Sequence, residues 1–171
     1  MMNKKTMFLP IRLFITLYFL TFCIACESNM IFTVEDGSGP PNSKENEVTV
    51  TLYNPSIEIL GVQMDICDGS DYLTCTGCEN TERTPDFLCE TNELPNGCCR
   101  MVLISLALDP IEAGTGPIFT LIYDVSEEAP LGECRDLNTE GVIIVDENME
   151  PLDIRSISIP GEFCFEVDGN G

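Results

Sequence analysis

The 171-residue chain contains no histidine and no tryptophan. Without histidine, the Ser-His-Asp and Cys-His nucleophile systems and zinc sites built on imidazole are excluded. Carboxylate chemistry is what remains for an enzyme, but a carboxylate pair can always be selected from 29 acidic residues, so its presence alone does not indicate glycoside hydrolysis. We therefore expect that the protein is not an enzyme.

Basic residues are also scarce, because 8 lysines and arginines stand against 29 aspartates and glutamates, for a formal net charge of −21. Three of the 8 basic residues precede Cys26, so the chain from Cys26 onward has a formal charge of 5 − 29 = −24. Nucleic acid is excluded as a partner, since phosphate binding needs clustered lysine and arginine. The chain is nevertheless not a disordered acidic tail, because 44% of its residues are hydrophobic and recur in patterned runs.

Residues 1–25 have the pattern of a signal peptide: a positively charged start is followed by an apolar or hydroxyl-bearing run at 13–24, which is short for a membrane span. Cleavage before Cys26 would resemble a bacterial lipoprotein signal, in which the new N-terminal cysteine is lipidated. Cys23 stands where such signals usually carry leucine, so plain secretion and an uncleaved anchor are the alternatives. The prediction is a cell-surface or periplasmic lipoprotein held to the membrane only through Cys26, or a secreted protein.

Eight cysteines follow Cys26, and an even number in an exported chain predicts disulfides. They are Cys67, Cys75, Cys78, Cys89, Cys98, Cys99, Cys134 and Cys164. The spacing of Cys75 and Cys78 also fits half of a zinc site or a thioredoxin-like redox pair. Turn-forming residues surround this pair, however, whereas a redox motif needs a strand before it and a helix after it.

The adjacent residues Cys98 and Cys99 point to opposite faces of a strand, so we expect them to join different partners, with a bridge to each other as the alternative. The predicted partition is a local set of six cysteines within residues 67–99 and a separate pair, Cys134 with Cys164. The pairing within the six remains open.

Short alternating segments separated by Gly, Pro, Asn and Asp dominate the chain after the leader, which predicts an antiparallel sandwich. Strands are expected at 30–34, 47–53, 60–66, 101–108, 118–125, 132–136, 141–146, 152–159 and 162–167. The run 101–108 is nearly all apolar and predicts a central strand covered on both faces. Residues 68–97 hold few branched aliphatic side chains, so disulfides are expected to replace a core there.

Four stretches together resemble a cohesin domain, the nine-stranded jelly-roll receptor module of cellulosome scaffolds. They are residues 32–39 (FTVEDGSG); 48–54 (VTVTLYN) with 60–66 (LGVQMDI); 116–125 (GPIFTLIYDV) leading into 129–132 (APLG); and 159–163 (IPGEF). The resemblance covers most of residues 29–167 and implies an all-β, nine-stranded jelly-roll β-sandwich. The Cys-rich segment departs from typical cohesins and is expected to be a disulfide-stapled insertion.

The expected domain organisation follows from these segments. It comprises a signal peptide at 1–25, a short tether at 26–29, the sandwich at 30–167 with the Cys-rich insertion at 67–99, and a tail at 168–171. The tail is either a flexible acidic end or the first part of a dockerin-like calcium loop, which begins with Asp and continues with Asp or Asn at alternate positions.

The resemblance implies a non-catalytic extracellular recognition module that binds a dockerin-bearing protein partner in polysaccharide-related assemblies. A sandwich does not fix function, so a carbohydrate-binding module is the alternative, with polysaccharide as its ligand. Its candidate sugar platforms are Tyr53 and Tyr72, although a packed or isolated surface ring is the competing interpretation of each.

Asp65, Asp68 and Asp71 crowd a short stretch and are the candidate ligands for calcium, which takes roughly six to eight oxygen ligands. A solvated acidic loop is the competing interpretation in so acidic a chain. No other cofactor is expected.

Overall fold

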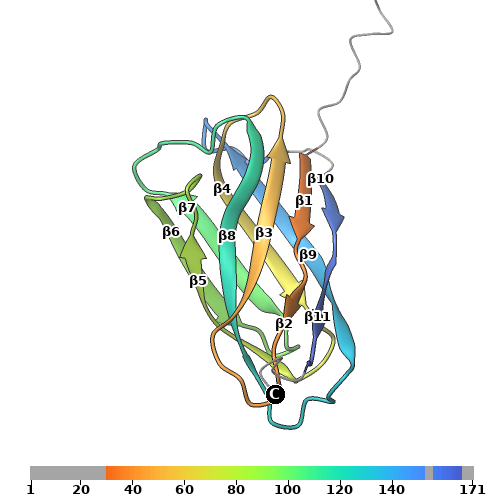
Figure 1. Ribbon diagram of the computed structural model, residues 1–171. Helices are drawn as coiled ribbons and strands as arrows, with labels where there is room; N and C mark the ends of the chain where they lie inside the picture. The colour runs from red at the N-terminus through yellow and green to blue at the C-terminus, as the bar shows by residue number, and fades with distance from the viewer. Residues whose placement is uncertain (1–29, 153–155, 167–171) are drawn as a thin grey trace, which may run out of the picture.

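The computed structural model describes residues 30–152 and 156–166, which form two β-sheets that face each other (Figure 1). The strands are β1 (Met30–Val34), β2 (Gly37–Ser38), β3 (Asn46–Asn54), β4 (Ile59–Cys67), β5 (Leu73–Asn80), β6 (Phe87–Glu93), β7 (Cys99–Ser105), β8 (Gly114–Val125), β9 (Cys134–Asp146), β10 (Ser156–Ile159) and β11 (Gly161–Cys164). In this described part of the chain, no helix is long and apolar enough to cross a membrane.

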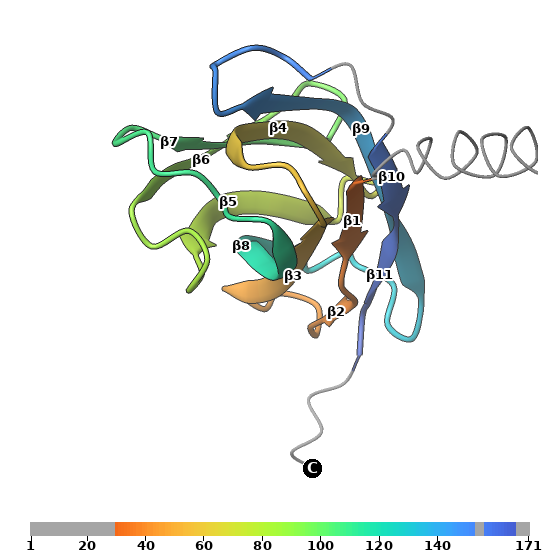
Figure 2. The same ribbon diagram turned by 90° about the horizontal axis from the view of Figure 1, so that it is seen from above.

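One sheet has five strands in the order β10-β1-β3-β8-β5, and the other has six in the order β2-β11-β9-β4-β7-β6. Figure 2 shows the two layers from above, with β3 and β8 in one layer and β4, β7 and β9 in the other. The all-β sandwich predicted from the alternating pattern is confirmed.

The strand boundaries differ from the expected ones most clearly in β9. Residues 134–136 and the expected strand 141–146 belong to this single strand, which continues through Gly141. Gly141 adopts a left-handed conformation with φ of 58°, and the register against β4 shifts nearby, between Gln63 and Asp65. A bulge of this kind lets one strand continue through a sequence with turn character. Short β2 and the two strands of the Cys-rich segment raise the number to eleven within the described residues.

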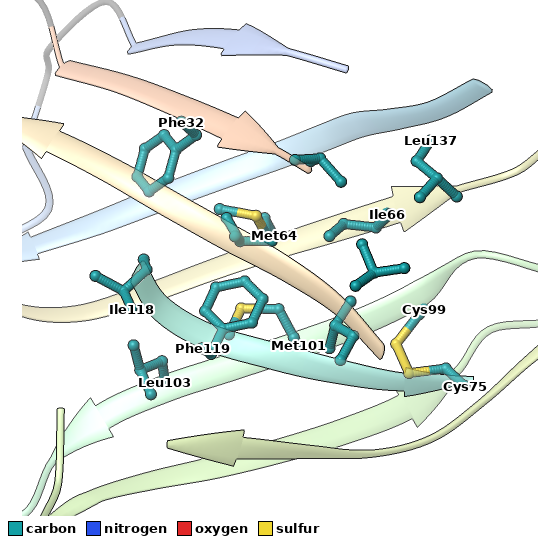
Figure 3. Packing of buried hydrophobic residues seen from close by; sticks show 14 of the residues in the cluster. Phe32, Met64, Ile66, Cys75, Cys99, Met101, Leu103, Ile118, Phe119 and Leu137 are labelled. Atoms are coloured by element: carbon teal, nitrogen blue, oxygen red, sulfur yellow. A yellow bond between two sulfur atoms is a disulfide. The ribbon is translucent and has the colours of Figure 1, made fainter. Parts of the chain in front are cut away.

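The core lies between the two sheets and is made of the alternate side chains of each strand. Phe32 and Phe119 come from the five-stranded sheet, and Met64, Met101 and Leu103 come from the six-stranded sheet; all five are fully buried and lie together in Figure 3. Period-2 alternation therefore placed Met64 and Phe119 correctly.

The Cys-rich segment is built into both sheets. Its first strand, β5, pairs with β8 in one sheet, and its second, β6, pairs with β7 in the other. Of the eight residues of β5, Leu73 and Cys75 alone are buried, so this edge contributes little apolar area. Disulfides supply the missing cohesion, as the composition of residues 68–97 predicted.

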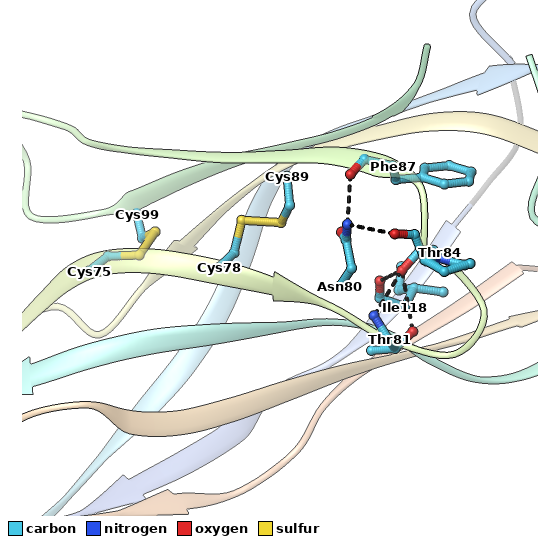
Figure 4. The surroundings of a disulfide bond; sticks show 10 residues. Cys75, Cys78, Asn80, Thr81, Thr84, Phe87, Cys89, Cys99 and Ile118 are labelled. Carbon is cyan, nitrogen blue, oxygen red and sulfur yellow. Dashed lines mark hydrogen bonds between the residues drawn. A yellow bond between two sulfur atoms is a disulfide. The ribbon is translucent and has the colours of Figure 1, made fainter. Parts of the chain in front are cut away.

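The turn between β5 and β6 is tied down by hydrogen bonds (Figure 4). Asn80 donates to the carbonyl oxygen of Phe87 at 2.7 Å, and the buried hydroxyl of Thr84 donates to the carbonyl oxygen of Ile118 at 2.6 Å. Arg83 donates to four oxygens at 2.8–3.1 Å: the carbonyls of Leu52, Gly116 and Glu112, and Oδ1 of Asn54. These bonds fasten the turn to the ends of β3 and β8.

A glycine at the start of β11 provides a test of the packing. A Cβ at Gly161 would lie 2.6 Å from the carbonyl oxygens of both Val34 and Glu35, so the two chain segments must move apart to admit it. We expect Gly161→Ala to lower the free energy of unfolding by about 1–3 kcal/mol in denaturant titrations. The control is Gly77→Ala, since a Cβ there meets no atom within 4 Å. Equal stabilities of the two variants would contradict the close approach.

Candidate functional site

The side chains that point outward from four strands of the six-stranded sheet form a regular grid, here called the six-strand outer face. Antiparallel register places residues of β6, β7, β4 and β9 directly opposite one another in three rows. The rows are Leu88–Ile104–Gly61–Val145, Glu90–Val102–Gln63–Ile143 and Asn92–Arg100–Asp65–Glu140. Strands hold these side chains more rigidly than loops would.

The first row is aliphatic apart from Gly61, and the second combines Val102 and Ile143 with Glu90 and Gln63. Leu88 and Ile143 are 39% and 46% exposed, and Val102 and Ile104 lie half-buried between them. Scattered exposed aliphatic residues are ordinary, but Leu88 lies directly opposite Ile104, and Val102 is the neighbouring outward residue of β7, so these three form a contiguous apolar surface. This surface is what a protein interface requires at its centre.

The loop that follows β7 adds to the apolar character of this end of the sheet. Leu106 is 71% exposed and Leu108 is 57% exposed, and both come directly after the last outward residue of β7. On the far side of β4, Met149 in the loop after β9 is 64% exposed. Both loops adjoin the sheet end that carries the apolar rows.

The third row is polar and contains a bidentate ion pair. Arg100 Nε lies 2.7 Å from Asp65 Oδ1, and Arg100 Nη2 lies 2.7 Å from Asp65 Oδ2. The hydrogen bonds to Asp65 and its charge raise the pKa of Arg100 above its ordinary value. Arg100 is therefore a fixed, charge-compensated donor at the edge of the apolar rows.

The outer face of the five-stranded sheet has a different chemistry. Thr49 and Thr120 lie directly opposite each other with their hydroxyls 3.2 Å apart. A groove of about 480 Å³ beside β5 is lined by Glu45, Glu47 and Glu79. Hydroxyl and carboxylate groups therefore line this face along β3, β8 and β5. At the β10–β1 edge, Ile157, Ile31 and Tyr53 lie directly opposite one another and add an apolar strip.

Two of the three predicted calcium ligands have side-chain partners within the protein. Asp65 is engaged by Arg100, while Asp68 is 9% exposed and accepts a hydrogen bond from the Ser70 hydroxyl. Over residues 30–152 and 156–166, the one cluster of metal-ligating atoms is Cys134, Glu162 and Cys164, which contains none of the three aspartates. Asp65 lies on a strand beside a cation that is 35 residues away in the sequence, and the calcium site stays a prediction.

The two tyrosines proposed as sugar platforms occupy different environments. Tyr53 is 43% exposed on the outer face of the five-stranded sheet, directly opposite Ile31 and Thr115. Tyr72 packs against the core, with its ring edge-on to Phe165 at 5.9 Å and the Arg135 guanidinium 5.6 Å from its centroid. For Tyr72 the packed-ring interpretation holds, since Phe165 and Arg135 occupy its surroundings.

All eight cysteines expected to pair are in disulfides. The bonds are Cys67–Cys98, Cys75–Cys99, Cys78–Cys89 and Cys134–Cys164. The partition into a local six and a separate pair is confirmed, as are the different partners of Cys98 and Cys99. Figure 4 shows Cys75–Cys99 and Cys78–Cys89 reaching from β5 to neighbouring strands. The proposed lipidation site, Cys26, and the segments 1–25, 26–29 and 168–171 lie outside the described residues.

Sequence reasoning missed the six-strand outer face, although one signal for it was present. The apolar run 101–108 was interpreted as a strand covered on both faces, but β7 ends at Ser105 and only its alternate residues are buried. A nearly continuous apolar run in an antiparallel sheet with one open face is itself the sign of an exposed apolar surface. The opposed residues of β6 and β9 could be added only from the register.

The sandwich has the cohesin-like jelly-roll fold. A non-cellulosomal cohesin from the hyperthermophilic archaeon Archaeoglobus fulgidus superposes with a TM-score of 0.64 at 15% identity, covering 83% of this chain and 94% of that one. The seventh ScaB type I cohesin from Pseudobacteroides cellulosolvens gives 0.66 at 12% identity, covering 84% and 95%.

A further similar structure is the sixth cohesin of Acetivibrio cellulolyticus scaffoldin B, which was solved in complex with a dockerin mutant. It superposes with a TM-score of 0.65 at 15% identity, and the match covers 81% of this chain and 99% of that one. No protein-family model and no curated protein sequence matches the chain. At these identities, the similarity defines the fold of the chain.

The carboxyl group of Asp68, which directly follows β4, predicts how the stability of the fold depends on pH. Burial raises the pKa of Asp68 above its ordinary value, despite the hydrogen bond from Ser70. The folded state therefore binds this proton more tightly than the unfolded chain, and the stability linked to Asp68 is full below the unfolded pKa of about 4 and is lost as the pH rises through the folded pKa.

We expect Asp68→Asn, which keeps an acceptor for the Ser70 hydroxyl, to stabilise the fold relative to the unmodified chain at pH 7 and to lose that advantage near pH 4. Thermal unfolding at the two pH values measures the difference. Asp71→Asn, an exposed neighbour, is the control. An advantage of Asp68→Asn that is the same at both pH values would contradict a raised pKa.

Proposed function

We propose that this chain is a non-catalytic, cohesin-type recognition module whose six-strand outer face binds a dockerin-bearing protein. The observation that carries the proposal is the group of aliphatic side chains that β6, β7 and β9 present in the first two rows, beside the ion pair of Arg100 with Asp65. Cohesins of similar fold are described in complex with dockerins, which supports this class of partner.

The chemistry of the face supports protein rather than polysaccharide as the ligand. Protein interfaces have an apolar centre and a polar rim, and this face has Val102, Ile104 and Ile143 at its centre with Glu90 and Glu140 beside them. Sugar binding draws on exposed planar rings, and the outward residues of this face include none.

The net charge of the chain limits which surface charge the partner can have. With about −24 charges after the leader, approach of a basic surface is accelerated and approach of an acidic one is opposed. We infer a partner that presents aliphatic side chains surrounded by lysine or arginine. The association rate should therefore fall as salt is added.

The proposed location is outside the cytoplasm, with Cys26 as a lipid anchor. Replacing Cys26 by serine is expected to move the protein from the membrane fraction to the soluble fraction of its host, because one sulfur is the attachment point. Cys23→Leu, which restores the usual residue of a lipoprotein signal, is the matched control and should stay with membranes. Membrane retention of Cys26→Ser would indicate an uncleaved anchor instead.

The face itself is tested with two isoleucines that are equally exposed on opposite sheets. Ile143, on the six-strand outer face, and Ile157, on the five-stranded sheet, are both 46% exposed. With the oxidised domain immobilised in calcium, we expect Ile143→Asp to weaken capture of dockerin-bearing proteins at least about tenfold, because it places a charge at the centre of the interface. Ile157→Asp should leave capture unchanged.

Insoluble polysaccharides are tested in parallel on the same domain. Retention by polysaccharide with no dockerin-bearing protein captured would overturn the proposal and assign a carbohydrate-binding module, in which Tyr53 would be the first residue to mutate. Equal loss in Ile143→Asp and Ile157→Asp would place the interface elsewhere.

A further inference from the structure

Two cysteines and a glutamate converge at the end of the sandwich formed by β9 and β11. Cys134 and Cys164 lie directly opposite each other in the antiparallel pair, with Cα atoms 4.0 Å apart and a disulfide between them. Glu162 lies two residues before Cys164 and therefore points to the same face of the sheet. One ligand atom from each of the three residues lies within 4.8 Å of the others.

This disulfide is the most accessible of the four. Cys134 is exposed and Cys164 is half-buried. Each of two other bonds has at least one buried member, with Cys98 at 5%, Cys99 at 1% and Cys75 at 8% exposure. The remaining bond joins Cys78 to Cys89, which are partly buried against the core. Thiol–disulfide exchange needs access to a sulfur atom, so an external thiol reaches the Cys134–Cys164 bond first.

The two strands hold these cysteines together without the bond. β11 pairs with β9 over Gly161–Cys164 and with β2 on its other side, and the carbonyl of Cys164 accepts a hydrogen bond from Gly39 at 3.1 Å. The amide of Glu162 donates to Asp36 Oδ1 at 2.9 Å. After reduction, the thiols and the carboxylate therefore remain neighbours on a fixed backbone.

We propose that the Cys134–Cys164 pair is a redox-gated site for a thiophilic divalent metal ion such as Zn²⁺, with Glu162 as the third protein ligand. Two thiolates and a carboxylate suit zinc, and three protein ligands with a water complete four-coordination. The Glu162 carboxylate takes part in none of the ion pairs of the described residues, and the acidic surface attracts cations.

The chemistry balances with a dithiol as the reductant. One dithiolate sulfur attacks the disulfide, the second closes the reductant into its own disulfide, and two electrons with two protons convert the bond into the thiols of Cys134 and Cys164. Binding of Zn²⁺ then releases both thiol protons. In the oxidised protein neither sulfur is available as a thiolate, so the ion is not bound.

The first experiment measures which disulfide opens. The folded, oxidised protein is treated with a limiting dithiol, alkylated and analysed by peptide mass spectrometry. We expect label on Cys134 and Cys164 before any other disulfide-bonded cysteine. Label appearing first on residues 67–99 would overturn the proposal.

The second experiment measures metal binding by the selectively reduced protein. Cd²⁺, a spectroscopic substitute for zinc, is expected to bind with one equivalent and to produce a thiolate charge-transfer absorption. Glu162→Gln should weaken binding at least about tenfold, a loss that removal of even an outer partner of a metal site can cause. Asp136→Asn is the matched control, since Asp136 lies directly opposite Glu162 yet falls outside the ligand cluster.

A double variant, Cys134→Ser with Cys164→Ser, keeps the other three disulfides and reports on background binding in a folded domain. If the reduced protein binds Cd²⁺ no more tightly than this variant, the site does not exist. If Glu162→Gln and Asp136→Asn weaken Cd²⁺ binding equally, the loss reflects the removal of a nearby negative charge, and Glu162 is not a ligand.

Discussion

Disulfides between the two sheets are the constraint on which this fold depends. β5 buries little beyond Leu73 and Cys75, so apolar contact alone would hold it weakly against the opposite layer. Cys75–Cys99 ties β5 to β7, and Cys78–Cys89 ties it to β6. Because these bonds close the sandwich at its β5–β6 edge, the outward side chains of β6 and β7 are not needed to hold the two sheets together.

The same chain combines a strongly acidic surface with an exposed aliphatic one. A formal charge of −24 from Cys26 onward opposes self-association, which favours a single domain with Leu88 and Ile143 exposed. For the proposed partner, selectivity would follow from two requirements: an apolar centre that matches the aliphatic side chains of the face, and a basic rim that matches the charge of the chain. Rigid strands meet these requirements with little loss of side-chain freedom on binding.

Local sequence patterns predicted part of the candidate site, and long-range strand pairing decided the rest. The alternation in β3 and β4 predicted their buried faces, and the even cysteine count predicted disulfides. The surroundings of Asp65 and Tyr72 could not be predicted, for one reason. Each has its decisive neighbour far along the chain: Arg100 for Asp65, and Phe165 and Arg135 for Tyr72. Composition and spacing hold no information on such contacts, because they arise when strands pair.

By itself, the sequence determined which chemistry the protein cannot perform and which side chains it buries. The absence of histidine removes imidazole chemistry, the period of two demands a sandwich, and the cysteines demand cross-links where aliphatic residues are few. Only the tertiary structure decided which residues share a surface. Hydrogen-bond register set Leu88, Ile104 and Val145 in one row and set Cys134 beside Cys164 with Glu162. A shift by one residue in any of these strands would turn the same side chains to the opposite face, so the surface depends on the pairing.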